Sequence, residues 1–376
     1  MNTMSIPELG KPIYFKIMTN PYTMRLLKNY LLTTSIFFVS LIISEVSFAQ
    51  KNPKADVVVS LDGSGQFKSI QEAINAAPDN SSTRFVILLK NGKYNTEKLI
   101  VPASKRNLTL IGESREKTIV SYHIFDCKSS ESQNKCPVEA WALWKDNKEL
   151  IRTSATLTVL AADFIAENLT ISNTAGPVGQ ALALTLRGDK IVFRNCNLLG
   201  YQDTILLGND GMRNYFVGCL ILGRTDYIYG GGIGFFQSCE VRSYGGGWIT
   251  APSTPETQSY GYVFNKCDFT YVNNSPRNGD DGRKIAIGRP WHNYPKVAIL
   301  NSKMCEEMDP KGWPTSWNMD YAATSDKLHL YEYNNTGKGA DMSQRAKWAG
   351  LRALTAQEVK LYTVENVFRD WNPSIL

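Results

Sequence analysis

Two aspartates in the middle of this 376-residue chain hold equivalent positions in a repeated pattern. Asp203 lies seven residues after Cys196, and Asp226 lies seven residues after Cys219. If the cysteines mark neighbouring rungs of one coil, equal offsets stack the two carboxyl groups with Cα atoms roughly 5 Å apart. Like charges this close cannot both ionise cheaply, and one acid beside one carboxylate can perform nucleophilic attack with leaving-group protonation. Spacing alone leaves two solvated aspartates on an exposed face as the alternative.

Other catalytic chemistries lack their residues. The sequence has no Gly-x-Ser-x-Gly elbow, no Cys-x-x-Cys pair, no His-Glu-x-x-His and no phosphate-binding glycine loop. Its three histidines (His123, His292 and His329) leave few candidates for a His-based mechanism. We therefore expect no metal and no organic cofactor.

The elements that must position the aspartates follow from an internal repeat. Each copy reads aromatic, two spacers, cysteine, one spacer and an apolar residue. The clear copies begin at Phe193, Phe216, Phe236 and Phe264, and the weaker ones at Phe164 and Ile299. Because strand side chains alternate with period two, an aromatic and a cysteine three apart both face inward only if the chain bends between them. The bend positions are Asn195, Gly218, Ser238 and Lys266, and Asn and Gly tolerate positive φ.

Short strands joined by such corners, with cysteines 23, 20 and 28 residues apart, predict an all-β chain that forms a parallel β-helix. A sandwich of hairpins would need two-residue turns such as Asn-Gly, which are scarce here. An amphipathic N-terminal capping helix is predicted around Phe67–Ala77, stopped by Pro78. Thr355-Ala-Gln-Glu358 is typical of a capping box and predicts a helical C-terminal tail. We expect residues 50–376 to form a single domain.

The first 49 residues have the layout of a secretory signal peptide. Two basic residues precede an apolar run over Leu31–Ile43, and small residues precede Gln50. The run is short for a membrane span, although a buried core helix is an alternative. We expect translation to start at Met24 and cleavage after Ala49, giving a secreted protein, or a periplasmic one in a Gram-negative cell.

Charge and cysteine usage narrow the partners and the redox state. The formal net charge of +6 suits an acidic polymer without requiring one, and no Lys/Arg run indicates nucleic acid. We expect a monomer with no membrane partner after signal removal. The seven cysteines leave at least one unpaired. Rung cysteines are usually small buried apolar residues, but Cys219–Cys239 or Cys196–Cys219 lie within bridging range, and we expect a Cys127–Cys136 bridge in an exported chain.

Five segments, in order, resemble the signature blocks of the pectin methylesterase family. They are Gly92-Lys-Tyr94 with Glu97; Asn173-Thr-Ala-Gly176 followed by Gln180-Ala-Leu-Ala-Leu184; Tyr201-Gln-Asp-Thr204; Asp226-Tyr-Ile-Tyr-Gly230; and Gly288-Arg-Pro-Trp291. The resemblance covers about residues 55–376, and five ordered blocks are highly specific. It implies a right-handed parallel β-helix of the pectin lyase type that hydrolyses the methyl esters of homogalacturonan to pectate and methanol.

The resemblance also implies catalytic roles. Asp226 would attack the C6 ester carbonyl to form an acyl-enzyme, while Asp203 would protonate the departing methanol and then activate water. Gln180 and Gln202 would donate amide N–H groups to the tetrahedral oxyanion. Arg289 would pair with Asp226, orient it and lower its pKa, the alternative being a surface ion pair.

Substrate contacts are implied in the same way. Trp291 would present an aromatic face to the sugar chain, with Tyr201, Tyr229 and Thr225 lining the cleft; core packing is the alternative for Trp291. The family usually has Phe at both positions filled by Tyr227 and Tyr229, and Val in place of Thr225. We expect the added tyrosine hydroxyls to alter the pocket for the methyl group.

Two other functions compete with this one. A β-helix polygalacturonase or lyase would act on unesterified pectate, and Gly279-Asp-Asp281 resembles an acidic motif of polygalacturonases. However, no Gly-His-Gly follows it, and its setting is typical of an exposed loop. A non-catalytic pectin-binding β-helix would not need both aspartates, Arg289 and the two glutamines together. Methanol release without chain shortening separates these functions.

Overall fold

The structure is a computed structural model that describes residues 54–126, 155–208, 210–273, 282–315 and 320–375. Lys54–Leu376 forms one compact unit. Three features predicted above lie outside the described residues: the signal segment 1–49, the Cys127–Cys136 bridge and the Gly279–Asp281 motif. Among the helices of the described part, none is long and apolar enough to cross a membrane.

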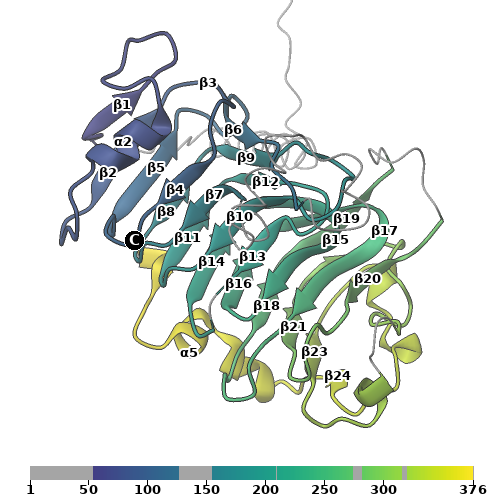
Figure 1. The fold of residues 1–376 in the computed structure, drawn as a ribbon. Coiled ribbons are helices and arrows are strands. Elements are labelled where there is room, and N and C mark those ends of the chain that lie inside the picture. The colour runs from purple at the N-terminus through teal and green to yellow at the C-terminus, as the bar shows by residue number, and fades with distance from the viewer. Residues whose placement is uncertain (1–53, 127–154, 209, 274–281, 316–319, 376) are drawn as a thin grey trace, which may run out of the picture. The chain divides into compact units, whose positions relative to one another are not determined.

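Strands that stack in parallel, rung upon rung, build this unit (Figure 1). One sheet has 11 strands in chain order: β1 (Val57–Val59), β2 (Phe85–Leu89), β5 (Leu108–Gly112), β8 (Ile165–Glu167), β11 (Ile191–Arg194), β14 (Arg213–Val217), β16 (Ile233–Gln237), β18 (Tyr262–Asn265), β21 (Lys296–Leu300), β23 (His329–Tyr333) and β24 (Leu351–Ala353). Each of these strands belongs to a different turn of the coil. The prediction of a parallel β-helix is confirmed.

A second, 13-stranded sheet completes each turn. On one side it contains β3 (Gly92–Tyr94), β6 (Thr118–Tyr122), β9 (Thr170–Asn173), β12 (Asn197–Leu199), β19 (Asp268–Val272) and β22 (Lys303–Met304). On the other it contains β4 (Leu99–Val101), β7 (Ala155–Val159), β10 (Leu182–Leu186), β13 (Ile205–Leu207) and β20 (Ile285–Gly288). The long strands β15 (Leu220–Gly230) and β17 (Glu240–Pro252) join the two sides, since β15 pairs with both β12 and β13. The two predicted catalytic aspartates lie where this join occurs.

The repeated aromatic residues form a continuous stack in the core. Phe193, Phe216, Phe236 and Phe264 are Cα partners on successive rungs and are fully buried. Their ring centroids lie 5.4, 4.7 and 4.5 Å apart with nearly parallel planes. The bend positions after them have positive φ, 50° at Asn195 and 52° at Ser238. The bend therefore turns both the aromatic residue and the cysteine toward the core, as the spacing predicts.

The alternative of a Cys219–Cys239 or Cys196–Cys219 disulfide is wrong, because all three residues are free, buried cysteines, as the preferred interpretation has it. Each thiol points into the core and donates to a backbone carbonyl of the preceding rung. The distance is 3.5 Å from Cys219 Sγ to the oxygen of Phe193, and 3.5 Å from Cys239 Sγ to the oxygen of Phe216. Burial raises the pKa of Cys196 and Cys239 well above the usual value, so these thiols stay protonated. They behave as small buried apolar residues.

Helical segments lie at both ends of the solenoid. Near the N-terminus, α2 (Ile70–Ala76) begins after Ser69, whose hydroxyl accepts a hydrogen bond from the N–H of Glu72 at 3.1 Å. At the other end, Thr355 and Glu358 exchange two hydrogen bonds of 2.8 and 3.2 Å before a 3₁₀ turn. The other short helices among the described residues are η2 (Asp320–Ala323), η3 (Lys338–Ala340), η4 (Met342–Gln344), η5 (Glu358–Tyr362), α5 (Val364–Phe368) and η6 (Pro373–Ile375).

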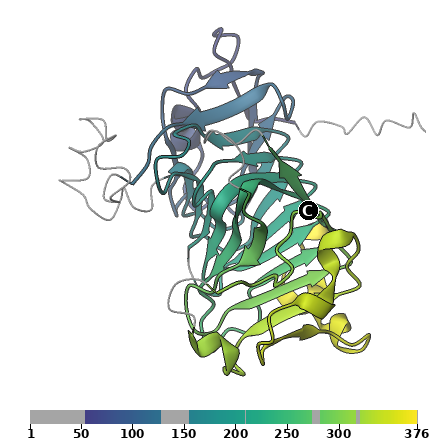
Figure 2. The same cartoon turned by 90° about the vertical axis from the view of Figure 1, so that its right-hand side faces the viewer.

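The C-terminal segment, yellow in Figures 1 and 2, runs back along the outside of the 11-stranded sheet. The Phe368 ring of α5 packs on Tyr215 of β14 and Phe235 of β16, with centroids 6.2 and 6.0 Å apart. Arg213 donates to the carbonyl oxygen of Phe368 at 2.8 Å. The segment therefore covers apolar side chains on the outer face of this sheet.

Candidate active site

Equivalent residues of successive turns form a column at the join between the two sides of the second sheet. Parallel bridges connect Gln180 to Gln202 and Gln202 to Thr225, and Thr225 is the Cα partner of Trp248. Asp203 follows Gln202 and Asp226 follows Thr225, so the two aspartates lie on neighbouring rungs. The N–H of Asp203 donates to the carbonyl oxygen of Thr225 at 3.0 Å.

Both aspartates have left-handed backbone conformations, with φ of 62° at Asp203 and 49° at Asp226. Aspartate tolerates this region better than most residues with a side chain. After Asp226 the strand alternation is broken, because consecutive Tyr227 and Ile228 both belong to the hydrophobic core. The register of β15 against β17 shifts at the same place. Because of this irregularity, the Asp226 side chain is not one of those that point into the core.

Asp226 is held by both nitrogens of one edge of a guanidinium group. Arg289 follows β20, and its Nε and Nη2 atoms donate to Oδ1 and Oδ2 of Asp226 at 2.9 and 2.6 Å. The exposed fractions of the two residues are 5% for Asp226 and 9% for Arg289. The pair is buried, which contradicts the alternative of a surface ion pair.

The pKa of Asp226 differs from the sequence prediction. Burial raises this pKa above its ordinary value, and the hydrogen bonds and charge of Arg289 lower it by less. The predicted net lowering is therefore wrong, because the cost of removing a carboxylate from water exceeds the gain from its partner. Arg289 still favours the ionised form, and its two-point contact fixes the orientation of the carboxylate.

The side-chain amide of Gln180 lies at the start of the column. Its Oε1 atom is buried and has no hydrogen-bond partner within the described part of the chain. Because amide oxygen and nitrogen positions are interchangeable by a flip, this buried group offers either an acceptor or a donor. The backbone oxygen of Gln180 accepts from the N–H of Asp126 at 2.8 Å, which fixes the start of this rung.

Gln180→Ala and Gln202→Ala are each expected to lower kcat roughly 10²-fold, the usual effect of losing one oxyanion donor. The effect on KM should be smaller, because the oxyanion exists only along the reaction path. Initial rates of hydrolysis of the methyl esters that the sequence resemblance implies as substrate measure both constants. A change confined to KM would instead make these glutamines simple sugar contacts.

The aromatic residues predicted to contact substrate differ in exposure. Trp291 is 43% exposed, so core packing is excluded for it, and its ring lies 6.0 Å from that of Tyr229 at an angle of 58°. Tyr201 is buried and stacks on Tyr244 with centroids 6.1 Å apart. Of the predicted substrate contacts, Trp291 therefore presents the largest free surface, while Thr225 is half-buried.

Tyr227 does not line the site. Its side chain is fully buried in the core, and its hydroxyl forms a 2.9 Å hydrogen bond with that of Ser243. The expectation that the Tyr227 hydroxyl alters the methyl pocket is wrong, because the residue after Asp226 turns inward. Tyr229 instead packs in a small outer cluster with Leu206 and Ala251.

Sequence reasoning missed Trp248. The centre of the Arg289 guanidinium lies 4.0 Å from the centroid of the Trp248 ring. Nothing in the aromatic–cysteine repeat points to this residue. The only local signal is the preceding run Gly245–Gly247, which indicates a close approach between backbones.

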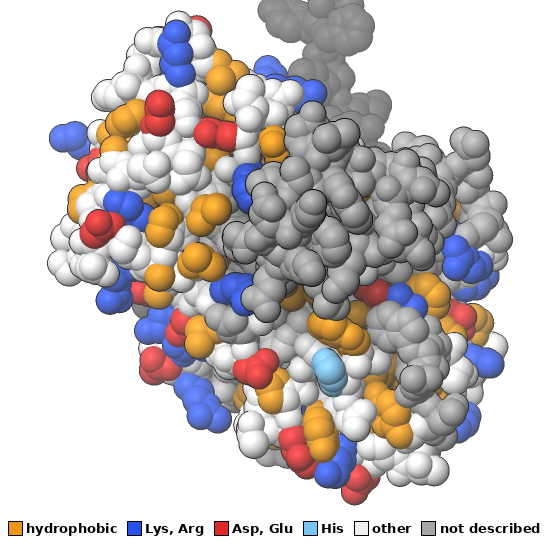
Figure 3. Space-filling view, viewed as in Figure 1, with side chains coloured by type: hydrophobic (Ala, Val, Ile, Leu, Met, Phe, Trp, Pro, Cys, Tyr) orange, Lys and Arg blue, Asp and Glu red, His pale blue; other side chains and the backbone are white. Residues whose placement is uncertain are grey.

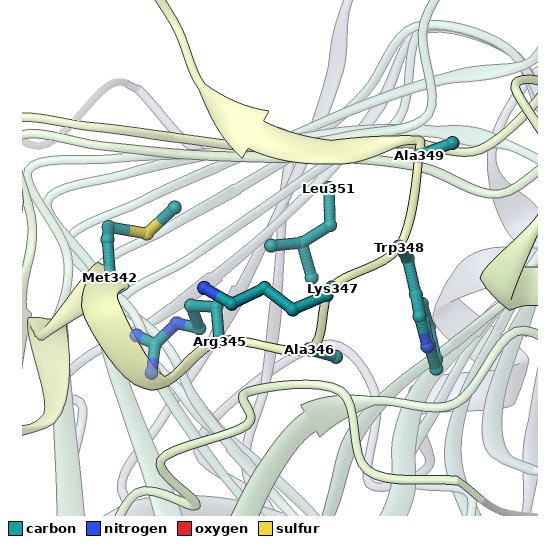
Figure 4. A pocket seen from close by; sticks show the side chains of 7 residues that line it. All are labelled: Met342, Arg345, Ala346, Lys347, Trp348, Ala349 and Leu351. Atoms are coloured by element: carbon teal, nitrogen blue, oxygen red, sulfur yellow. The ribbon is translucent and has the colours of Figure 1, made fainter.

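A hollow of about 450 Å³ near the C-terminal end shares no residue with this site (Figure 4). Its lining consists of Met342, Arg345, Ala346, Lys347, Trp348, Ala349 and Leu351. This lining holds no carboxylate, hydroxyl or thiol side chain, so it is not a second candidate for ester chemistry. On the face shown in Figure 3, side chains of both charges are interspersed among the described residues.

Comparisons with known proteins agree on one family. A family model described as Pectinesterase matches residues 56–370. A curated Arabidopsis thaliana relative, probable pectinesterase/pectinesterase inhibitor 13, is 33% identical over 328 residues, covering 85% of this chain and 49% of its own length. The chain thus spans about half the length of the curated relatives it matches.

Solved structures show the same likeness. A pectin methylesterase from carrot has 30% sequence identity and a TM-score of 0.71, with 84% of this chain and 93% of that chain covered. A mutant pectin methylesterase in complex with a hexasaccharide has 28% identity and a TM-score of 0.66, with 85% and 98% covered.

Proposed function

This chain belongs to the pectinesterase family, and from that premise we propose that it hydrolyses the methyl esters of homogalacturonan to give pectate and methanol. The observation that carries the proposal is the buried Asp226, which lies on the rung next to that of Asp203 and is bound at both carboxylate oxygens by Arg289. A nucleophile requires a carboxylate in a fixed orientation, and a second carboxyl group on the neighbouring rung can serve it as acid and base.

In the first half-reaction, an Asp226 carboxylate oxygen attacks the carbonyl carbon of the C6 methyl ester. A carbon–oxygen bond forms, and the negative charge moves to the carbonyl oxygen, where the amides of Gln180 and Gln202 stabilise it. Collapse of this intermediate breaks the bond to the methoxy group. Asp203, starting in its acid form, gives its proton to the departing methanol and leaves an acyl-enzyme on Asp226.

In the second half-reaction, Asp203 acts as a base. It removes a proton from water, and the hydroxide oxygen attacks the acyl carbon. Asp226 departs as a carboxylate that Arg289 receives at both oxygens, and the sugar is released with a free acid group. Asp203 ends protonated, so the cycle closes with one ester and one water consumed for each methanol formed.

The exposed aromatic surface favours a sugar polymer as the substrate. Trp291 presents an exposed apolar face two residues after Arg289, with its ring 6.0 Å from that of Tyr229, and such faces pack against sugar rings. The complex of the mutant relative with a hexasaccharide supports a chain of several sugars as ligand. We also propose export after cleavage behind Ala49, which N-terminal sequencing of the mature protein tests.

One assay tests the proposed function directly. The purified full chain, processed by its host, is incubated with highly methylated pectin, and both methanol and polymer length are measured. Methanol release at constant polymer length supports the esterase. Shortening of the polymer without methanol would indicate a polygalacturonase or lyase, and binding without either product would indicate a non-catalytic pectin-binding protein.

A further inference from the structure

Trp248 lies on the turn that separates Asp226 from Arg289. On β17 it is the Cα partner of Thr225 on one side and of Ala286 on the other. The residue before it must be small, because a Cβ atom on Gly247 would lie 2.1 Å from the carbonyl oxygen of Arg224. The absent side chain lets β17 approach β15 closely and brings the indole ring to the rung beside the nucleophile.

The indole ring and the carboxylate hold different parts of the same guanidinium group. Arg289 presents its Nε–Nη2 edge to Asp226, and its Cζ atom lies over the face of the Trp248 ring, 4.0 Å from the ring centroid. An aromatic face attracts a cation and excludes water from that side, while leaving the in-plane N–H groups free to donate. The two contacts are therefore compatible, and together they restrict both the edge and one face of the guanidinium.

The indole N–H does not explain the orientation of the ring. Trp248 Nε1 is buried and has no hydrogen-bond partner in the part of the chain that the structure describes. Burying a donor without a partner costs free energy, so another contact must favour this placement. The stack on Arg289 is the contact that the geometry offers.

We propose that Trp248 is a positioning residue that acts on the reaction through Arg289. Its aromatic face holds the guanidinium in the plane from which both oxygens of Asp226 are bound. This inference rests on the proposed function. It distinguishes Trp248 from Trp291, whose exposed ring is placed to meet the sugar chain directly.

Kinetics of methanol release by the full chain test this role. Trp248→Leu is expected to lower kcat about 5–30-fold, the range for a desolvated cation–π contact, with KM changed less than about twofold. Trp248→Phe keeps a smaller aromatic face and lacks the unpaired N–H, so its loss should stay within about threefold. In an Arg289→Ala background, Trp248→Leu should have no further effect, because its target is gone.

Matched variants separate this role from general damage. Trp348→Leu changes a partly buried tryptophan outside the site and should leave kcat unchanged. Thermal melts check that each variant is folded, and Trp248→Met, which fills similar space without an aromatic face, replaces the Leu variant if that unfolds.

Three results would overturn the inference while the proposed function stands. They are a wild-type kcat in Trp248→Leu, a loss confined to KM, and an equal loss in the Arg289→Ala background. A wild-type chain that releases no methanol would instead overturn the proposed function, and this inference with it.

Discussion

Replacing Asp226 by asparagine is expected to lower kcat for methanol release by at least about 10³-fold, the scale of losing a covalent nucleophile. The amide has nearly the shape of the carboxylate and keeps an oxygen that can accept from Arg289, so the chain should still fold. What it lacks is the electron pair that forms the acyl-enzyme. Initial rates, together with circular dichroism and thermal melts, measure both parts of the prediction.

The chain offers a matched control in a second buried pair of the same form. Arg345 donates from Nε and Nη2 to the two oxygens of Glu332 at 2.7 and 3.2 Å, and both residues are less than 5% exposed. Glu332→Gln should lower the free energy of unfolding by about 1–3 kcal/mol while kcat stays near the wild-type value. If Asp226→Asn retains more than a tenth of wild-type activity, Asp226 is not the nucleophile.

The sequence could predict which rungs carry the site residues, but not how those residues are packed. The offset of seven residues from Cys196 and Cys219 predicts that Asp203 and Asp226 lie on neighbouring rungs, because a β-helix repeats its geometry at each turn. The same regularity predicts the phenylalanine stack. These predictions succeed because they depend only on period and on the direction of side chains.

Predictions that depend on exact packing were less accurate. Stacked cysteines fall within bridging range on any pair of rungs, and only the structure shows that the thiols of Cys219 and Cys239 donate to backbone oxygens. The pKa of Asp226 depends on how much water reaches it, which no spacing reveals. Tyr227 turns inward because the chain bends at Asp226, and the strand alternation that a sequence suggests ends there.

Arg289→Ala is expected to lower the rate of methanol release roughly 10³-fold near neutral pH. About 10²-fold of this comes from the lost orientation of the nucleophile. The rest comes from ionisation: burial already raises the pKa of Asp226, and removing Arg289 removes the hydrogen bond and the charge that oppose this rise. Asp226 then ionises only at higher pH, and the acidic limb of the kcat/KM profile should move upward.

Arg289→Lys separates charge from geometry. A lysine keeps the positive charge but lacks the planar edge that binds both carboxylate oxygens, so the rate should fall with a smaller shift of the acidic limb. The acidic limb is a macroscopic quantity of the whole site, so it is compared between variants and not assigned to one residue. If Arg289→Ala lowers the rate equally at every pH, Arg289 only positions the substrate, and another group keeps Asp226 ionised.

The stability of Arg289→Ala provides a readout that needs no substrate. A carboxyl group whose pKa is higher in the folded state than in the unfolded chain binds its proton more tightly when folded, so stability falls as pH rises between the two values. Removing Arg289 raises the folded pKa of Asp226 further. The variant should therefore be less stable than the wild type near pH 7, and this difference should shrink as pH falls toward about 4, the ordinary value for aspartate. Urea unfolding across this range measures the difference, and a stability loss that is constant with pH would mean that Arg289 does not control the ionisation of Asp226.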